Sequence, residues 1–366
     1  MTAGEIALVS LIVGFIVTLA AVTGFAYTTL YERKLLARMQ HRVGPNRAGY
    51  IPIPGRGKKE RKLLGGIMQP AADAVKLFFK EDPTPARVDR PTYNLAPMLA
   101  AITAIMIFAV VPWAPELTIF GYTFSPYFAV APGINVAIVF VLAITSVAVY
   151  GVVLGGWSSN SKYAVMGGIR ASAQMISYEL ALGLAVIPAI MLANSMDLGA
   201  IVEAQRSMWF VVLQPLAAFI FFVGALAELE RAPFDLLEAE QELSSGFNVE
   251  YGGMRFGMFF MTQYMKMIAF SAIFATLFMG GYLGPFLDQA PALGFIYIII
   301  KIIIVMFLMI WIRATLPRFR YDQLMQFGWK QLLPIGLANV VVTAFFIILV
   351  EEQILNFDNL TAIFGF

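Results

Sequence analysis

The sequence predicts an all-α protein, a polytopic bundle of about eight transmembrane helices that forms a single membrane domain over residues 1–366. Hydrophobic residues make up 60% of the chain, charged residues only 13%, and the mean hydropathy is +0.77. Soluble domains contain about 45–50% apolar and about 25% charged residues. The apolar residues also gather in windows of roughly twenty residues, the length that an α-helix needs to cross about 30 Å of hydrocarbon.

Eight windows are almost free of charge and are predicted to span the membrane. They are residues 5–30, 93–112, 134–156, 173–193, 208–230, 258–282, 293–312 and 332–350. The first has no basic segment before it and is longer than the apolar core of a cleavable signal peptide, so we expect it to remain as a membrane helix.

Lysine and arginine residues lie almost entirely on one side of the predicted bundle. Of the 25 basic residues, 22 fall in the segments that follow spans 1, 3, 5 and 7. By the positive-inside rule these inward loops, residues 31–92, 157–172, 231–257 and 313–331, face the cytoplasm. Both termini then face outward, in agreement with an even number of spans.

The chain has no cysteine and a single histidine, His41. It therefore has no disulfide and no iron–sulfur or zinc site held by thiolates, and one histidine cannot provide bis-histidine haem ligation. We predict no metal site and no redox cofactor in the chain itself. Any electron carriers would belong to partners.

The first inward loop contains one predicted helix that is too short to span the membrane. Pro70 suits its first turn, and the apolar side chains of residues 67–82 share a face from which Asp73 and Lys76 project away. This pattern indicates an amphipathic helix at the membrane surface or against a partner. The basic stretch before it, residues 51–66, is most simply solvated charge, with a lipid or partner contact as the alternative.

The third inward loop is unusually acidic. Residues 228–250 hold seven carboxylates against one basic residue, Arg231. Asp235, Glu238 and Glu242 fall on one helical face, whereas Glu240 points away. Because crowded like charges repel, such carboxylates do not all stay ionised, and the cluster could store and pass protons. A negatively charged docking face is the alternative.

Ionisable residues also occur inside the predicted spans, where they are costly and usually face a bundle interior or water. Glu179 lies about seven residues into the fourth span, and Lys266 and Lys301 lie deep in the sixth and seventh. Glu32 and Glu228 lie at inner span ends, from which they could reach the interface. The three acids fit a polar path from the cytoplasmic side to mid-membrane, with paired structural charges as the alternative.

The last inward loop joins an aromatic membrane edge to three arginines, Arg313, Arg318 and Arg320. These side chains could bind lipid headgroups. They could equally surround the head of an amphipathic ligand that enters from the bilayer.

Five long motifs occur in order along the chain. They are YERKLLARMQHRVGPNRAG (31–49), QPAADAVKLFFKED (69–82), GWSSNSKYAVMGGIRASAQMISYE (156–179), ERAPFDLLEAEQELSSGFNVEYGGM (230–254) and WIRATLPRFRYDQLM (311–325). With these motifs the chain resembles the H subunit of the proton-pumping NADH–quinone oxidoreductase (complex I), whose mitochondrial counterpart is subunit 1. The resemblance covers about residues 32–334.

The resemblance implies a multi-pass subunit of a bacterial-type inner membrane at the junction of the peripheral and membrane arms. Its partners would be the quinone-module subunits of the peripheral arm, small membrane-arm subunits and lipids, without nucleic acid. Quinone would be the substrate, whereas FMN and iron–sulfur clusters would belong to partner subunits. The enzyme would be a proton-translocating NADH–quinone oxidoreductase.

The resemblance also implies roles for single residues. The quinone chamber would be formed by Arg33, Asp73, Lys76, Glu228, Arg231, Asp235, Glu238, Glu240, Glu242, Arg313, Arg318 and Arg320. The proton path would use Glu32, Glu179, Glu228 and Lys301. No residue is assigned a direct catalytic role.

The chain departs from the family pattern at four places. Leu237 stands where proline is frequent, and the stretch 51–66 is longer than the family core requires. Gln263 stands where the family usually has glutamate, and Lys266 follows where a neutral residue is common. Two alternative functions stay open, a homologous membrane subunit of an energy-converting hydrogenase-type complex and a stand-alone proton or ion antiporter.

Overall fold

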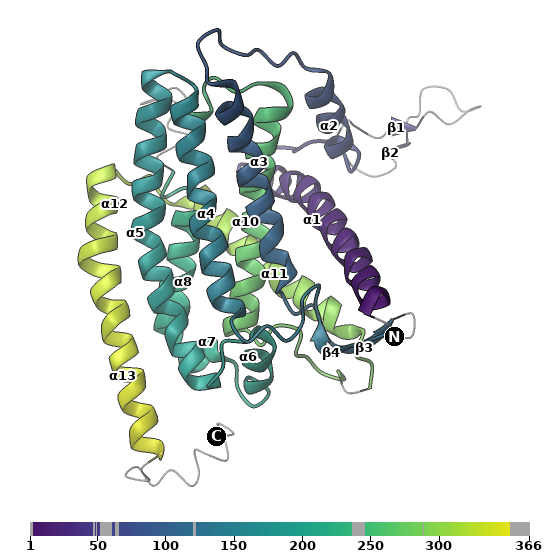
Figure 1. Cartoon of the computed structure of the whole chain (residues 1–366), viewed down its shortest axis with the longest axis vertical. Helices are drawn as coiled ribbons and strands as arrows, with labels where there is room; N and C mark the ends of the chain where they lie inside the picture. Colours follow the sequence, from purple (N-terminus) through teal and green to yellow (C-terminus); the bar gives the residue numbers. More distant parts are fainter. Residues whose placement is uncertain are drawn as a thin grey trace.

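The structure, a computed structural model, is a bundle of long helices with two short antiparallel pairs of strands (Figure 1). It describes residues 3–46, 48, 50–51, 61–62, 66–119, 122–235, 246–287 and 289–351. Glu238, Glu240, Glu242 and Leu237 lie outside the described residues, as does most of the basic stretch 51–66.

The long helices are α1 (Ala3–Met39), α3 (Arg90–Met106), α4 (Ala137–Ser158), α5 (Lys162–Ala193), α10 (Gly253–Phe278), α11 (Leu293–Thr315) and α13 (Leu333–Glu351). The shorter helices are α2 (Gln69–Phe79), α6 (Leu198–Ala204), α7 (Phe210–Leu213), α8 (Pro215–Glu228) and α12 (Tyr321–Phe327). Single turns are η1 (Ile107–Ala109), η2 (Gly246–Asn248) and η3 (Gly328–Leu332). The strands are β1 (Tyr50–Ile51), β2 (Arg61–Lys62), β3 (Ala114–Ile119) and β4 (Tyr122–Phe128).

Seven helical segments of the described chain are long and apolar enough to cross a membrane, which confirms the predicted all-α membrane bundle. The fifth predicted span, residues 208–230, is corrected to two helices, α7 and α8. Gln214 leaves the helical conformation (φ −129°, ψ 58°), and Pro215 begins α8. Proline cannot donate a backbone hydrogen bond and its ring clashes with the preceding turn, so the helix restarts there. The 14 residues of α8 cover only about 21 Å.

Several helices extend beyond the apolar windows that predicted them. α1 continues to Met39, α5 begins at Lys162, and helical residues resume at Tyr321. Helical structure therefore occupies most of 157–172 and much of 313–331, segments that hydropathy assigns to loops. Hydropathy marks only the length that crosses hydrocarbon, whereas a helix can continue into water. Glu179 consequently lies about midway along α5 rather than near its start.

The helix α10 is the most buried of the long helices and forms the centre of the bundle. It contacts α1, α3 and α11, while α5 contacts α4, α8 and α13. In Figure 1 α3, α4 and α5 stand side by side, and α13 lies along the outer side of α5. The buried core is mainly alanine, isoleucine, leucine, phenylalanine and valine, most of them from α5, α8, α10 and α11.

The two ends of the bundle differ. The β3–β4 hairpin, α6 and α7 lie at one end, where α1 begins and α13 ends, and α2 lies at the opposite end (Figure 1). The predicted amphipathic helix is confirmed as α2. Its side chains Val75, Phe78 and Phe79 are 56%, 68% and 87% exposed.

Tyr127 of β4 holds the hairpin end together. Its hydroxyl donates to Asp197 Oδ1 at 2.6 Å and accepts from the Gly133 N–H at 3.2 Å. Burial, followed by the hydrogen bond to Asp197, raises the pKa of Tyr127 well above its ordinary value of 10. The neutral hydroxyl therefore contributes stability that is fully present below pH 10.

Tyr127→Phe is expected to lower the free energy of unfolding by about 1.5–3 kcal/mol at pH 7, because the hydrogen bond to a carboxylate is lost. The difference between wild type and variant should shrink as the pH rises through 10, because tyrosine ionises in the unfolded chain but not in the folded one. Thermal unfolding of the solubilised complex at pH 7 and about pH 10.5 measures both effects. The exposed Tyr150 supplies the control, Tyr150→Phe, and equal effects of the two variants would contradict the prediction.

Candidate functional site

Three charged side chains from distant parts of the chain meet inside the bundle. Glu32 of α1 accepts from Arg231 Nη1 at 3.0 Å (Oε1) and 3.1 Å (Oε2), and it also accepts from Arg313 Nη1 near the end of α11. Glu32 and Arg231 are only 3% and 4% exposed. The sequence allowed Glu32 to reach the interface, but the structure buries it in an ionic cluster.

The aromatic ring of Tyr264 completes this cluster. The Arg231 guanidinium carbon lies 4.3 Å from the Tyr264 ring centroid, the geometry of a cation–π contact. Tyr264 belongs to α10, so four elements hold the cluster: α1, the segment after α8, α10 and α11. Burial of this kind is tolerated only because the charges pair with one another.

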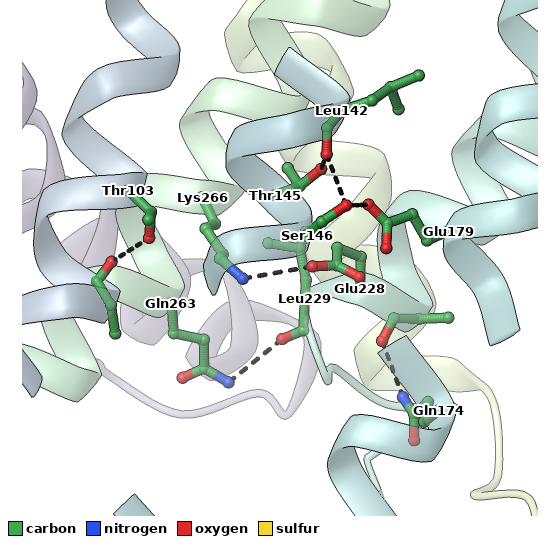
Figure 2. A network of polar contacts seen from close by, with 12 residues as sticks. Thr103, Leu142, Thr145, Ser146, Gln174, Glu179, Glu228, Leu229, Gln263 and Lys266 are labelled. Carbon is green, nitrogen blue, oxygen red and sulfur yellow. Dashed lines mark hydrogen bonds and ion pairs between the residues drawn. The ribbon is translucent and has the colours of Figure 1, made fainter. Parts of the chain in front are cut away.

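A second buried ion pair joins the end of α8 to α10. Lys266 Nζ of α10 lies 3.3 Å from Glu228 Oε1 of α8, and the two residues are 4% and 2% exposed (Figure 2). Within the described part of the chain, the other Glu228 oxygen, Oε2, is buried without a hydrogen-bond partner. The same two elements are joined by Gln263, whose amide donates to the Leu229 carbonyl at 3.5 Å.

Glu179 of α5 lies beside this pair. It is close enough to Glu228 to interact electrostatically, and its carboxyl contacts the Ser146 hydroxyl of α4 (Figure 2). The same hydroxyl lies 3.0 Å from the Leu142 carbonyl. Ser146 has one proton for these two acceptors. An ionised Glu179 accepts that proton, whereas a protonated Glu179 can donate to Ser146 and leave Leu142 as its acceptor.

The carboxyl of Glu179 also borders an apolar cavity of about 500 Å³. The cavity is lined by α4 and α5 and by Leu333 and Leu337 of α13. Glu179 is its only ionisable lining residue within the described chain. The three acids predicted for a polar path, Glu32, Glu228 and Glu179, thus lie in adjoining parts of one bundle. Glu179 lies at the edge of the bundle, beside the cavity.

The polar segment after α8 is anchored by Gln174 of α5, which is fully buried. Its amide Nε2 donates to the Ala227 carbonyl at 2.8 Å and to the Phe234 carbonyl at 2.9 Å. The Phe319 N–H donates to the Pro233 carbonyl at 3.1 Å. The Phe234 ring stacks on Phe319 with centroids 5.7 Å apart. These contacts join the start of the acidic loop to the arginine-containing loop.

Two comparisons with known proteins bear on the identity of this site. The profile of a family described as NADH dehydrogenase matches residues 12–344. The chain is 48% identical over 338 residues to the H subunit of the NADH-quinone oxidoreductase of Syntrophotalea carbinolica, covering 92% of this chain and 94% of the relative. It is 46% identical over 342 residues to the second H subunit of Syntrophobacter fumaroxidans, covering 93% and 96%. The chain belongs to the H-subunit family of NADH–quinone oxidoreductases.

As a member of this family, the chain is a membrane subunit of a multi-subunit oxidoreductase complex. The second H subunit of Rhizobium meliloti, at 44% identity over 315 residues, covers 86% of this chain and 90% of its own length. The family assignment favours this complex over the hydrogenase-type and antiporter alternatives. Among the described residues no group of three or more His, Cys, Asp or Glu side chains could hold a metal ion.

Not every residue that the family resemblance singled out joins the buried cluster. Arg33 pairs with Asp73 of α2 at 2.7 Å, but both side chains are half-exposed, and Lys76 is exposed. Arg318 and Arg320 are exposed at the bundle surface. Asp235 is half-buried at the last described position before the acidic stretch.

Lys301 is also separate from the acids of the predicted path. Its Nζ donates to the carbonyls of Gly281 and Leu283, each at 2.8 Å, and lies 4.8 Å from the Trp209 ring centroid. Lys301 precedes Arg313 by twelve residues of α11, which is about 18 Å along the helix. The structure therefore does not bring Lys301 together with these acids. The sequence could not predict this, because the depth of a residue in a span does not show near which end of the bundle its side chain lies.

Sequence reasoning missed four polar residues of the bundle, Ser146, Gln174, Tyr264 and Gln205. Gln205, 1% exposed, donates to the Ile201 and Thr276 carbonyls and accepts from the Phe210 and Gly280 N–H groups, so it joins α6, α7 and α10. The available signal was an uncharged polar residue inside or beside an apolar window. Such residues are buried and hydrogen-bonded in membrane bundles as charged ones are.

Proposed function

We propose that this subunit forms much of the wall of a quinone chamber at the junction of the peripheral and membrane arms, and that it couples quinone reduction to proton translocation. The observation that supports this most is the buried Glu228–Lys266 pair beside the Glu32–Arg231–Arg313 cluster. Both lie where the acidic and arginine-containing loops join the bundle. A change of charge in those loops therefore acts directly on buried ionisable groups.

The electrons for quinone would come from FMN and iron–sulfur clusters in partner subunits. Reduction of a quinone to a quinol takes up two electrons and two protons, so negative charge develops at its head until protons arrive. The arginines and carboxylates of the chamber wall, Arg231 and Arg313 with Glu32, would respond to that charge. The surface groups Arg33, Asp73, Lys76, Arg318 and Arg320, with Asp235 and the acids 238, 240 and 242, would line its outer parts.

The acids Glu228 and Glu179 would carry the response toward the membrane arm. The unpartnered oxygen of Glu228 can take up a proton, and the Ser146 hydroxyl permits Glu179 to be either charged or protonated. Lys266 would compensate the charge of Glu228 whenever the Glu228 carboxylate is ionised. Lys301, at the other end of α11, would stabilise that end rather than pass protons to these acids.

The family resemblance and the charge distribution support a placement in the cell inner membrane with both termini outward. Quinone-module subunits of the peripheral arm would then bind the inward loops. Small membrane-arm subunits would cover the α5 and α13 side that Glu179 borders, because a carboxylate facing hydrocarbon is costly.

Glu228→Gln and Glu179→Gln are each expected to lower NADH–quinone reductase activity and coupled proton transport together, by about tenfold or more, because a proton carrier is replaced by a neutral amide of the same shape. Reductase rates and proton uptake into membrane vesicles containing the assembled complex measure both. Glu116→Gln is the control, since Glu116 is an exposed carboxylate of β3. Normal rates of both processes in either variant of the fully assembled complex would contradict the proposal.

A further inference from the structure

Two lysines of the described chain are buried, and their surroundings differ. Lys301 Nζ donates to two backbone carbonyls, each at 2.8 Å, and lies against the ring of Trp209. Lys266 has one hydrogen-bond partner within the described residues, Glu228 Oε1, at 3.3 Å. Hydrogen bonds from an ammonium to a carboxylate are usually about 2.7–2.9 Å long. Lys301 is therefore held firmly, whereas Lys266 is held by a single long contact.

The Glu228–Lys266 pair has few hydrogen-bond partners for two charged groups. An ammonium can donate through each of its N–H bonds, and both oxygens of a carboxylate accept. One contact joins the two side chains, and the second Glu228 oxygen, Oε2, has no partner within the described residues. The two residues are only 2% and 4% exposed, so solvent compensates little of their charge. In the neutral form, a protonated Glu228 donates to the Lys266 amine, and no charge is left in the site.

The surroundings of the pair act on its two forms in opposite directions. Glu179 of α5 is close enough to Glu228 to repel its carboxylate when both are ionised, and this repulsion disappears when Glu228 takes up a proton (Figure 2). Lys266, in contrast, contacts the last residue of α8, and the negative end of that helix favours a cation beside it. Because the two effects oppose each other, the pair can pass between its ionised and its neutral form.

The neighbouring polar side chains of α10 do not offer Glu228 a proton. Gln263 carries an amide, which does not ionise, and it donates instead to a backbone carbonyl after α8. The Tyr264 ring lies against the Arg231 guanidinium. Lys266 is therefore the group of α10 that can exchange a proton with Glu228 in the described structure.

We propose that Lys266 exchanges a proton with Glu228 and is the proton-carrying base that α10 contributes to this site. In the exchange an N–H bond of the Lys266 ammonium breaks while an O–H bond forms at Glu228 Oε1. Two opposite charges disappear, the net charge of the pair stays the same, and the reverse step restores the ion pair. Glu228 enters here as a proton-binding residue of the proposed function, on which this role of Lys266 depends.

Infrared difference spectra of the assembled complex follow both partners of the exchange. The oxidised complex is compared with the complex reduced by NADH in the presence of quinone, with and without isotope labelling of the lysine side-chain nitrogen. We expect reduction to weaken an ammonium band that the label shifts and that is missing from Lys266→Met. The C=O band of a protonated carboxyl should appear at the same time and be missing from Glu228→Gln.

Substitutions at position 266 separate a proton carrier from a fixed charge. Lys266→Arg keeps a cation that does not deprotonate in proteins, so the reductase rate and coupled proton transport should fall about tenfold or more. Lys266→His, whose imidazole exchanges protons near neutral pH, should retain severalfold more activity than Lys266→Arg. Lys162→Arg, at an exposed lysine, is the control and should leave both rates unchanged. Native gels and thermal unfolding verify that each complex is assembled.

Rates of Lys266→Arg equal to those of the wild type would show that Lys266 acts as a fixed charge and would overturn the proposal. So would a carboxyl band that appears without any weakening of the Lys266 ammonium band, a result that leaves the proposed role of Glu228 intact. Absence of both bands, with normal rates in Glu228→Gln, would instead contradict the role of Glu228 and that of Lys266 together. If Lys266→Arg does not assemble, the spectra of the wild-type complex decide.

Discussion

Glu32→Gln is expected to destabilise the folded subunit by about 3–5 kcal/mol, although it replaces only one oxygen by an amide nitrogen. The substitution leaves the buried Arg231 and the partly exposed Arg313 without the carboxylate to which both donate. Removing one partner of a buried ion pair costs about that much, because the remaining charge loses its carboxylate partner in a site that water reaches poorly. Less subunit should accumulate in assembled complex, and its thermal unfolding should shift to lower temperature.

The neighbouring residue of the same helix supplies the control. Arg33 pairs with Asp73 at 2.7 Å, but the two side chains are 46% and 34% exposed. Exposed ion pairs contribute about 0–1 kcal/mol, so Asp73→Asn should barely change stability. Thermal unfolding and immunoblot quantification of the complex in membranes measure both variants side by side. If Glu32→Gln is as stable as Asp73→Asn, the buried cluster does not hold the bundle together.

Gly167→Ala is expected to cost about 1–3 kcal/mol and to disturb the segment that returns from the acidic loop. An added Cβ would lie 2.7 Å from the Gly246 Cα and 2.9 Å from the Phe247 nitrogen. These are backbone atoms of η2, which cannot rotate away as a side chain would, so the helix and η2 must separate. Phe247 would then lose its edge-to-face packing on Phe259 of α10, whose ring centroid lies 5.0 Å away.

The same substitution at Gly183 should not lower the free energy of unfolding and is expected to raise it slightly. Gly183 also lies within α5, but an added Cβ there would meet nothing within 4 Å. Alanine in a helix interior is about 0.5–1 kcal/mol more favourable than glycine, so Gly183→Ala should be neutral or slightly stabilising. Thermal unfolding and reductase activity of both variants test the pair. A loss of stability at Gly183 equal to that at Gly167 would show that the contact with η2 does not account for the effect.

Much of the fold was predictable from the sequence for a simple physical reason. A helix that crosses hydrocarbon must satisfy its backbone hydrogen bonds internally and must be apolar along its length, so composition alone marks each crossing. The helix α2 was also predictable, because its apolar residues recur at helical spacing. The break at Gln214 and the extension of α5 back to Lys162 were not predicted, since hydropathy does not record where a helix is interrupted or continues into water.

The candidate site was predictable only in part. The chain itself determined that Glu32, Glu179, Glu228, Lys266 and Lys301 are rare and costly where they stand, and the motifs determined the family. Only the tertiary structure decided their partners. Glu32 meets Arg231 and Arg313, which are 199 and 281 positions away, while Lys301 binds backbone carbonyls at the other end of the bundle. The cost of burying a charge is a local property that a sequence reveals, whereas its compensation depends on which helices pack together.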